Sequence, residues 1–282
     1  MLTLSSAEMN TWIAALLWPL TRILGLIAAA PLFGNASVPI SLKIALGVLL
    51  ALIVAPLVPA MPGADPLSLA GLLILVQEML IGLAMGFSIR IVFAALEMAG
   101  EISSLTMGLG FATFFDPLSQ GRSSAISQLL ALLATMLFLA VNAHLVLLSA
   151  LAESFTSLPI SALPVSGAGF KQLADWGGKI FSSGVQLSLP IVAALLITNI
   201  ALGILTRAAP QLNLFGIGFP ITLGMGFLVL MTALPYLATP LQNLLNEGIE
   251  SSRRLPRTWA ARTPAPVPAP APAPAPPAPA LP

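Results

Sequence analysis

The chain has 282 residues, of which 57% are hydrophobic and only 7% are charged, and its mean hydropathy is +0.99. Soluble globular proteins carry about 25% charged residues, so this composition excludes an ordinary soluble domain and indicates a membrane protein. The net charge of +1 gives no electrostatic basis for binding nucleic acid, and the absence of cysteine excludes disulfides, thiolate metal sites and cysteine nucleophiles.

Long apolar segments follow one another along the chain, and about 20 apolar residues suffice to cross a bilayer as a helix. Short connections rich in Pro, Gly, Asn or Asp join the first three segments, which favours helical hairpins. A longer connection between the fourth and fifth segments is expected to leave the apolar core. The sequence thus predicts an all-α membrane protein, with a helical domain over residues 1–250 and six apolar helices at roughly 10–33, 40–60, 68–99, 122–152, 178–206 and 214–246.

The amino terminus, MLTLSSAEMNTWIAALL, has no basic region before its apolar residues. A cleaved signal peptide normally begins with such a region. No cleaved signal peptide is therefore expected.

Charged residues lie well inside two of these apolar segments: Arg22 in the first, and Glu78 and Arg90 in the third. A charge at the bilayer centre costs at least ~2.5–3.5 kcal/mol on insertion scales, so each side chain is expected to face protein or water. One interpretation is a proton relay or ion path. We favour the other, a buried ion pair or a contact with a partner subunit, because a transporter needs more polar groups converging at one depth.

The third segment also carries a small-residue pattern. Glu78, Gly82, Gly86 and Arg90 recur at every fourth position, and Gly82 with Gly86 forms a GxxxG pair that permits close helix packing. The flanking charges indicate that this face contacts protein and not lipid. Near the end of the segment, Glu97 and Glu101 are interpreted as solvated or pore-rim charges.

An unusual loop follows, MGLGFATFFDPLSQG, at residues 107–121. Loops between helices are normally polar, and an apolar one at membrane depth must be buried in protein or line a cavity. Its phenylalanines could block a pore by excluding water, with glycines as hinges and Asp-Pro favouring a turn. The alternative, which the residues alone favour, is that they pack beneath neighbouring helices without gating. The residues concerned are Gly108, Gly110, Phe111, Phe114, Phe115, Asp116 and Pro117.

No catalytic or metal-binding pattern is evident. His144 is the only histidine, and no set of His, Asp or Glu at ligand spacing surrounds it. A hydrogen-bonded structural role is therefore favoured over proton transfer. Neither a nucleophile elbow nor a phosphate-binding loop is present, so no enzymatic activity and no cofactor are expected.

The chain ends in a short basic segment, residues 251–263, followed by a Pro/Ala-rich tail, residues 264–282. The tail has no apolar periodicity, favours polyproline II and is expected to be disordered and outside the fold. Alternating the sides of the six segments places six Lys and Arg residues on the side of the carboxyl terminus and four on the other. The positive-inside rule then predicts a cytoplasmic carboxyl terminus.

The string RAAPQLNLFGIGFP at residues 207–220 resembles the turn between the fifth and sixth helices of the FliR family, the flagellar type III export-gate proteins related to the T subunit of injectisomes. NAHLVLLSALAESFTSLP, GLGFATFFDP, and Arg22 followed by Pro31 and Pro39 also fit the family pattern. The resemblance covers about residues 8–250 and looks flagellar. Its most specific positions are Arg207, Pro210, Gln211, Asn213, Phe215, Gly218, Phe219 and Pro220.

This resemblance implies a structural and gating subunit of the export gate in the bacterial inner membrane, within the flagellar basal body. Its partners would be FliP-like and FliQ-like subunits and an FlhB-like subunit, and its cargo unfolded polypeptide. Helical hairpins would wind around a central pore, partly beyond the bilayer, and the loop at 110–117 would be the plug. The alternative is a small proton-coupled secondary transporter using Glu78 and Arg90, although no inverted repeat is evident.

Overall fold

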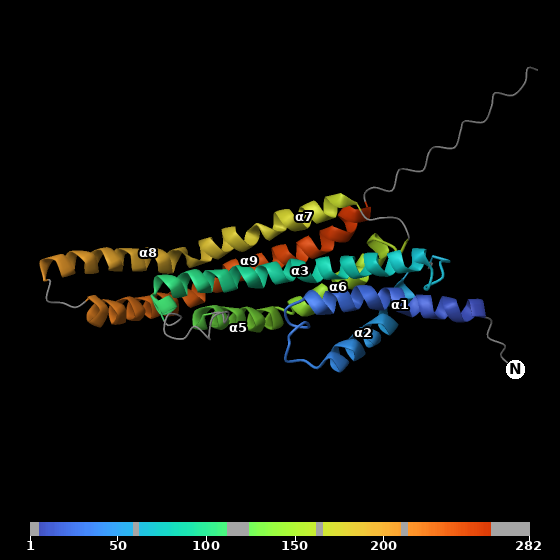
Figure 1. Ribbon diagram of the computed structural model, residues 1–282, viewed down its shortest axis with the longest axis horizontal. Coiled ribbons are helices and arrows are strands. Elements are labelled where there is room, and N and C mark those ends of the chain that lie inside the picture. The colour runs from blue at the N-terminus through green and yellow to red at the C-terminus, as the bar shows by residue number, and fades with distance from the viewer. Residues whose placement is uncertain (1–5, 59–61, 112–123, 162–165, 210–213, 261–282) are drawn as a thin grey trace, which may run out of the picture.

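The computed structural model describes residues 6–58, 62–111, 124–161, 166–209 and 214–260. These residues form helices and turns and contain no strand, which confirms the all-α class. Figure 1 shows an elongated bundle of roughly aligned helices. The α-helices are α1 (Ser6–Ala29), α2 (Ile40–Val54), α3 (Leu69–Thr106), α5 (Ala125–Ala140), α6 (Ala143–Ser157), α7 (Gly167–Gly177), α8 (Lys179–Ala208) and α9 (Phe219–Ala260).

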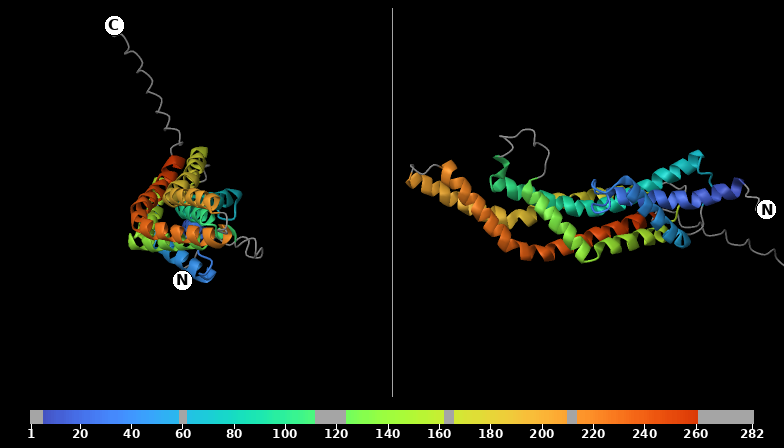
Figure 2. Two further views of the ribbon diagram at one scale, coloured as in Figure 1. Left: turned by 90° about the vertical axis from the view of Figure 1, so that its left-hand side faces the viewer. Right: turned by 90° about the horizontal axis from the view of Figure 1, so that it is seen from below.

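Helix α3 is the central element, and α1, α5, α8 and α9 all pack against it. It begins at Ser68, whose Oγ accepts a hydrogen bond of 3.1 Å from the Gly71 amide, as an N-cap residue does. Ser124 and Ser166 cap α5 and α7 in the same way. The α8–α9 hairpin projects past the carboxyl end of α3 (Figure 1), and α9 curves along the bundle (Figure 2).

Four of the described helical stretches are long and apolar enough to cross a membrane: Ile40–Leu57, Leu69–Thr106, Gly167–Ala208 and Gly216–Ala260. Helices α5 and α6 together would make a fifth, and Ile13–Ala29 is apolar but shorter. In α3, 67% of the most apolar window is buried, against 17% in α2 and in the windows of α8 and α9. Helix α3 is therefore a core element, whereas the other three expose apolar faces.

The fourth apolar segment was predicted as one helix, and this is wrong. Helices α5 and α6 meet at an angle of 67°, at Asn142, which has a left-handed backbone with φ of 55°. Asn adopts this conformation more readily than most residues do, because its short polar side chain bonds locally. Hydropathy does not reveal such a bend, since the residues on both sides of it are apolar.

The connection expected to leave the core instead contains α7, whose Trp176 packs on the core and donates a hydrogen bond of 2.9 Å to the Ser88 carbonyl.

Helices α3 and α9 also extend beyond their predicted ends, to Thr106 and Ala260. An apolar run ends where polar residues begin, but backbone hydrogen bonding continues through them. Helix α9 thereby includes most of the segment 251–263, and the tail 264–282 lies outside the described residues.

Candidate functional site

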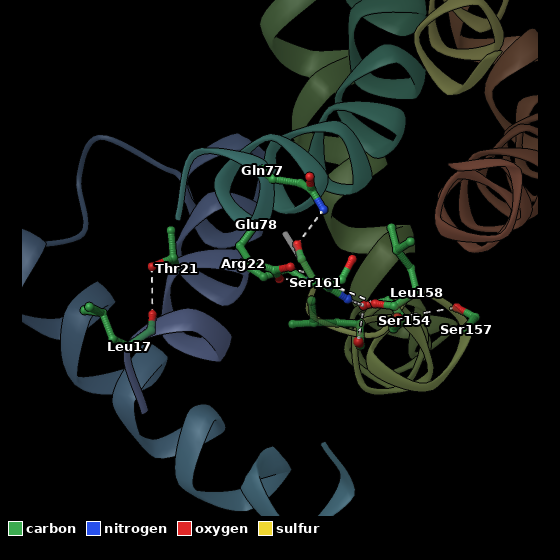
Figure 3. A network of polar contacts seen from close by, with 10 residues as sticks. Leu17, Thr21, Arg22, Gln77, Glu78, Ser154, Ser157, Leu158 and Ser161 are labelled. Atoms are coloured by element: carbon green, nitrogen blue, oxygen red, sulfur yellow. Dashed lines mark hydrogen bonds and ion pairs between the residues drawn. The ribbon is translucent and has the colours of Figure 1, made fainter. Parts of the chain in front are cut away.

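A buried ion pair joins α1 to α3 (Figure 3). Arg22 donates from Nε to Oε2 of Glu78 at 2.6 Å and from Nη2 to Oε1 at 3.0 Å, and both side chains are fully buried. Two parallel bonds match the planar guanidinium to the carboxylate, which is the strongest geometry for such a pair. Arg22 and Glu78 thus neutralise each other inside this chain.

The remaining donors of Arg22 reach the segment around the end of α6. Nη1 donates to Ser154 Oγ at 3.1 Å, and Nη2 donates also to the Leu158 carbonyl at 3.0 Å. The guanidinium carbon lies 4.3 Å from the centre of the Phe155 ring, within the range of a cation–π contact. Arg22 therefore ties three separate parts of the chain together, as Figure 3 shows.

Close contact between the backbones of α1 and α3 makes this pairing possible. A Cβ atom on Gly82 would lie 1.9 Å from the Arg22 carbonyl oxygen, and one on Gly86 would lie 2.7 Å from that of Leu26. In the same way, a Cβ on Gly25 of α1 would lie 2.7 Å from the Met79 carbonyl oxygen. The GxxxG pair thus packs directly on α1, one turn from Glu78.

Arg90 does not join this cluster. It is exposed on the far part of α3, ~18 Å along the helix axis from Glu78 at 1.5 Å per residue. The stripe from Glu78 to Arg90 is therefore divided into a buried part, which packs inside the chain, and an exposed end. Ser154, Phe155 and the Leu158 carbonyl complete the site, and no local signal in the sequence links them to Arg22.

The structure holds both ends of the apolar loop in place. Ser124, just after it, donates its amide to Oε2 of Glu101 at 3.2 Å, and the Ser127 hydroxyl donates to the Glu97 carbonyl. Gly100 lets the helices touch, because a Cβ there would lie 2.4 Å from the Ser127 Cα. Glu101 is thus partly buried and stabilises the base of the loop, whereas Glu97 is exposed.

A small separate core supports this base. Met107, at the end of α3, packs with one residue from the start of α5, two from α8 and one from α9: Ile126, Ile191, Leu195 and Leu230. Gly108 has a positive φ of 85°, a conformation that favours glycine. The turn Leu109–Phe111 begins the loop, and a Cβ on Gly110 would lie 2.9 Å from a Leu105 methyl carbon. Phe114, Phe115, Asp116 and Pro117 lie outside the described residues.

The described residues of the family-like turn belong to the end of α8 and the start of α9, at the projecting end of the hairpin (Figure 1). Arg207 is exposed in the last turn of α8. Leu214–Gly218, which includes Phe215, forms a π-helical turn, and Phe219 and Pro220 begin α9. Pro210, Gln211 and Asn213 lie outside the described residues.

The structure places His144 near the bend between α5 and α6, with its ring 6.3 Å from that of Phe138. Its Nδ1 is buried without a hydrogen-bond partner, so the hydrogen bond expected of a structural histidine is not formed by this atom. Among the described residues, no group of three or more His, Cys, Asp or Glu could hold a metal ion.

Comparison with known proteins gives a consistent result. Residues 13–248 match the family model described as bacterial export proteins, family 1. The flagellar biosynthetic protein FliR of Pectobacterium carotovorum subsp. carotovorum is 45% identical over 248 residues, covering 88% of this chain and 94% of the relative. FliR of Escherichia coli K12 is 40% identical over 247 residues, with 88% and 94% covered. FliR of Bacillus subtilis 168 is 30% identical over 239 residues, with 83% and 91% covered.

Proposed function

The chain belongs to family 1 of the bacterial export proteins, and we propose from this that it is a structural and gating subunit of a type III protein-export gate. The observation that carries the proposal is the match over residues 13–248, together with relatives that bear the name flagellar biosynthetic protein FliR. The resemblance inferred from the sequence is thereby confirmed. The cargo would be unfolded flagellar polypeptide crossing the inner membrane, with energy supplied elsewhere.

Exposed apolar faces support a role within an assembly. Ile40 on α2 is 74% exposed, Ile197 on α8 is 69% exposed and Met231 on α9 is 77% exposed. Such faces need lipid or protein to cover them. We propose FliP-like and FliQ-like subunits as the main partners, with an FlhB-like subunit beside them, and a cytoplasmic carboxyl terminus.

The gating part of the proposal concerns the loop 107–121. Its supports are the anchored base at Glu101 and Ser124 and the small core around Met107, which would hold a moving segment at a fixed place. Apolar side chains on such a segment would exclude water and ions from a pore. The transporter alternative has weaker support, because Arg22 occupies both oxygens of Glu78 and Arg90 lies far from them.

Co-purification tests the proposed function. The chain would be produced in membranes with and without FliP-like and FliQ-like chains of the same organism, and extracted in mild detergent. We expect one stable hetero-oligomer in the first case and heterogeneous material in the second, because lone chains leave apolar interfaces uncovered. A monodisperse monomer that ignores the other chains would contradict the proposal.

A further inference from the structure

A groove of about 790 Å³ lies between α8 and α9. One end is polar, lined by Ser183, Gln186 and Asn243 and closed by Lys179 and Glu247. The other end is mainly apolar and includes Pro190, Val229 and Ala233. Thr232 lies at this end, but its hydroxyl already donates within its own helix to Leu228 and Val229 carbonyls. The groove therefore changes from charged to apolar along its length.

The charged end is an ion pair that solvent and ligands can reach. Lys179 Nζ lies 2.7 Å from Glu247 Oε2, and the side chains are 42% and 49% exposed. Lys179 also lies 5.8 Å from the centre of the Trp176 ring. Residues 180–206 and 214–246 contain no Asp, Glu, Lys or Arg, so this pair marks the boundary between two uncharged helical arms and the polar end of the hairpin. Lys and Trp are common at such membrane–water boundaries.

The groove is long enough for one lipid chain. The rise from Lys179 to Pro190 on α8 is ~16 Å, and the rise from Glu247 to Val229 on α9 is ~27 Å, at 1.5 Å per residue. The hydrocarbon core of a bilayer is ~30 Å thick, so one leaflet spans ~15 Å. An acyl chain that starts below the ion pair would therefore end near Pro190.

We propose that this groove binds one glycerophospholipid with a zwitterionic, amine-bearing headgroup of the phosphoethanolamine type. The lipid phosphate accepts hydrogen bonds from Lys179, and its ammonium donates to Glu247. Ser183, Gln186 and Asn243 face the glycerol esters, and one acyl chain lies along Leu187, Pro190 and Ala233. An anionic headgroup without an amine would satisfy Lys179 but leave Glu247 beside a phosphate.

The pair of charges distinguishes this occupant from others. A ligand carrying both signs can replace the ion pair without leaving either side chain unpaired, whereas a purely apolar helix of a partner would leave the polar end of the groove unused. The inference concerns binding at the membrane boundary, and it rests on the proposed function only for the assembled complex in which it is tested.

Native mass spectrometry of the assembled complex tests the proposal. The complex would be reconstituted with equal amounts of phosphatidylethanolamine and phosphatidylglycerol, and the ratio of the two retained lipids measured. Glu247→Gln should lower the ethanolamine preference roughly two- to fivefold, as expected for a half-exposed charge contact. Glu153→Gln is the matched control: Glu153 is 51% exposed and pairs with Arg253 outside the groove, so its ratio should equal that of the wild type.

Three further variants make the result decisive. Exchanging the charges, as Lys179→Glu with Glu247→Lys, should restore the preference because a zwitterion can bind in the reverse sense. Ala233→Trp should fill the apolar end and remove one retained lipid. An unchanged lipid ratio in Glu247→Gln would overturn the proposal. So would an efficient cross-link from Ala233→Cys, the sole cysteine of that variant, to a partner chain, since the groove would then hold protein.

Discussion

Arg22 and Glu78 show how a pair of charges can be tolerated inside an apolar bundle. Both carboxylate oxygens of Glu78 accept a hydrogen bond from Arg22. Arg22 also donates to the Ser154 hydroxyl and to the Leu158 carbonyl. The pair itself is weak support for stability, because desolvation offsets much of the attraction. Removing one member is different, since the other charge is then buried without a partner.

Arg22→Ala should therefore destabilise the assembled protein by about 3–5 kcal/mol, whereas Arg22→Met combined with Glu78→Met should recover much of the loss. Thermal unfolding of the purified complex and protein levels in membranes would measure this. The control is Arg254→Ala, which breaks the exposed Arg254–Glu250 pair and should cost about 0.5 kcal/mol or less. Equal effects of Arg22→Ala and Arg254→Ala would show that the buried pair is unimportant.

Gly82 offers a second test at single-residue resolution. A methyl group there would lie 1.9 Å from the Arg22 carbonyl oxygen, whereas one at Gly203 on α8 would meet nothing within 4 Å. Gly82→Ala should lower the melting temperature, because α1 and α3 must separate and strain the ion pair. Gly203→Ala should leave it unchanged or raise it, since Ala is up to ~1 kcal/mol better than Gly within a helix. If both variants melt alike, the close packing of α1 on α3 is not required.

At the scale of elements, the bend between α5 and α6 determines the course of the chain. The two helices are separated only by Val141 and Asn142, yet they differ in direction by 67°. The bend directs α6 toward α9 and brings Ser154 and Leu158 to Arg22. A single left-handed residue thus contributes to the assembly of the ionic cluster.

Asn142→Gly should be tolerated, because glycine adopts positive φ freely, whereas Asn142→Val should cost about 1–2 kcal/mol. Distances between spin labels attached to α5 and α6, in a chain that otherwise lacks cysteine, would report the bend directly. We expect wild-type distances for Asn142→Gly and longer ones for Asn142→Val, as the helices straighten. Unchanged distances in Asn142→Val would mean that tertiary packing alone imposes the angle.

For the whole molecule, the arrangement separates a rigid core from the parts proposed to move. Helix α3 is buried among four others, and Met107 and Ile126, on either side of residues 112–123, lie in the same small core. A loop held at both ends can change its path while the helices beside it stay in place. This geometry suits a gate.

Replacing Phe111, Phe114 and Phe115 with serine should make the assembled gate leak ions, because loss of apolar bulk lowers the barrier that keeps a constriction dry. Growth sensitivity and ion flux in cells producing the variant would measure the leak, with assembly checked separately. Phe181→Ser is a suitable control, since Phe181 is 66% exposed on α8, ~15 Å along the helix from Ile191 in the small core around Met107. A complex that assembles normally and stays tight to ions would show that the seal lies elsewhere.

The amino-acid sequence is sufficient to identify the class of the molecule and the charged residues that its apolar helices must shield. Composition alone indicates apolar helices, and the cost of burying charge predicts that Arg22 and Glu78 must face protein or water. The Gly82–Gly86 spacing likewise indicates close packing. These inferences succeed because they follow from local composition and helical periodicity, which any membrane-embedded helix must obey.

Which side chains contact one another depends on how the helices pack in the folded chain. Arg22 finds Glu78 at a separation of 56 residues and Ser154 at 132, and no local pattern encodes such pairings. The bend at Asn142 and helix α7 were missed for a related reason: hydropathy records how apolar a segment is, not its direction or its hydrogen bonding. The ion pair between Lys179 and Glu247 becomes a groove end only when α8 and α9 fold side by side, because the shape of a binding surface depends on both helices together.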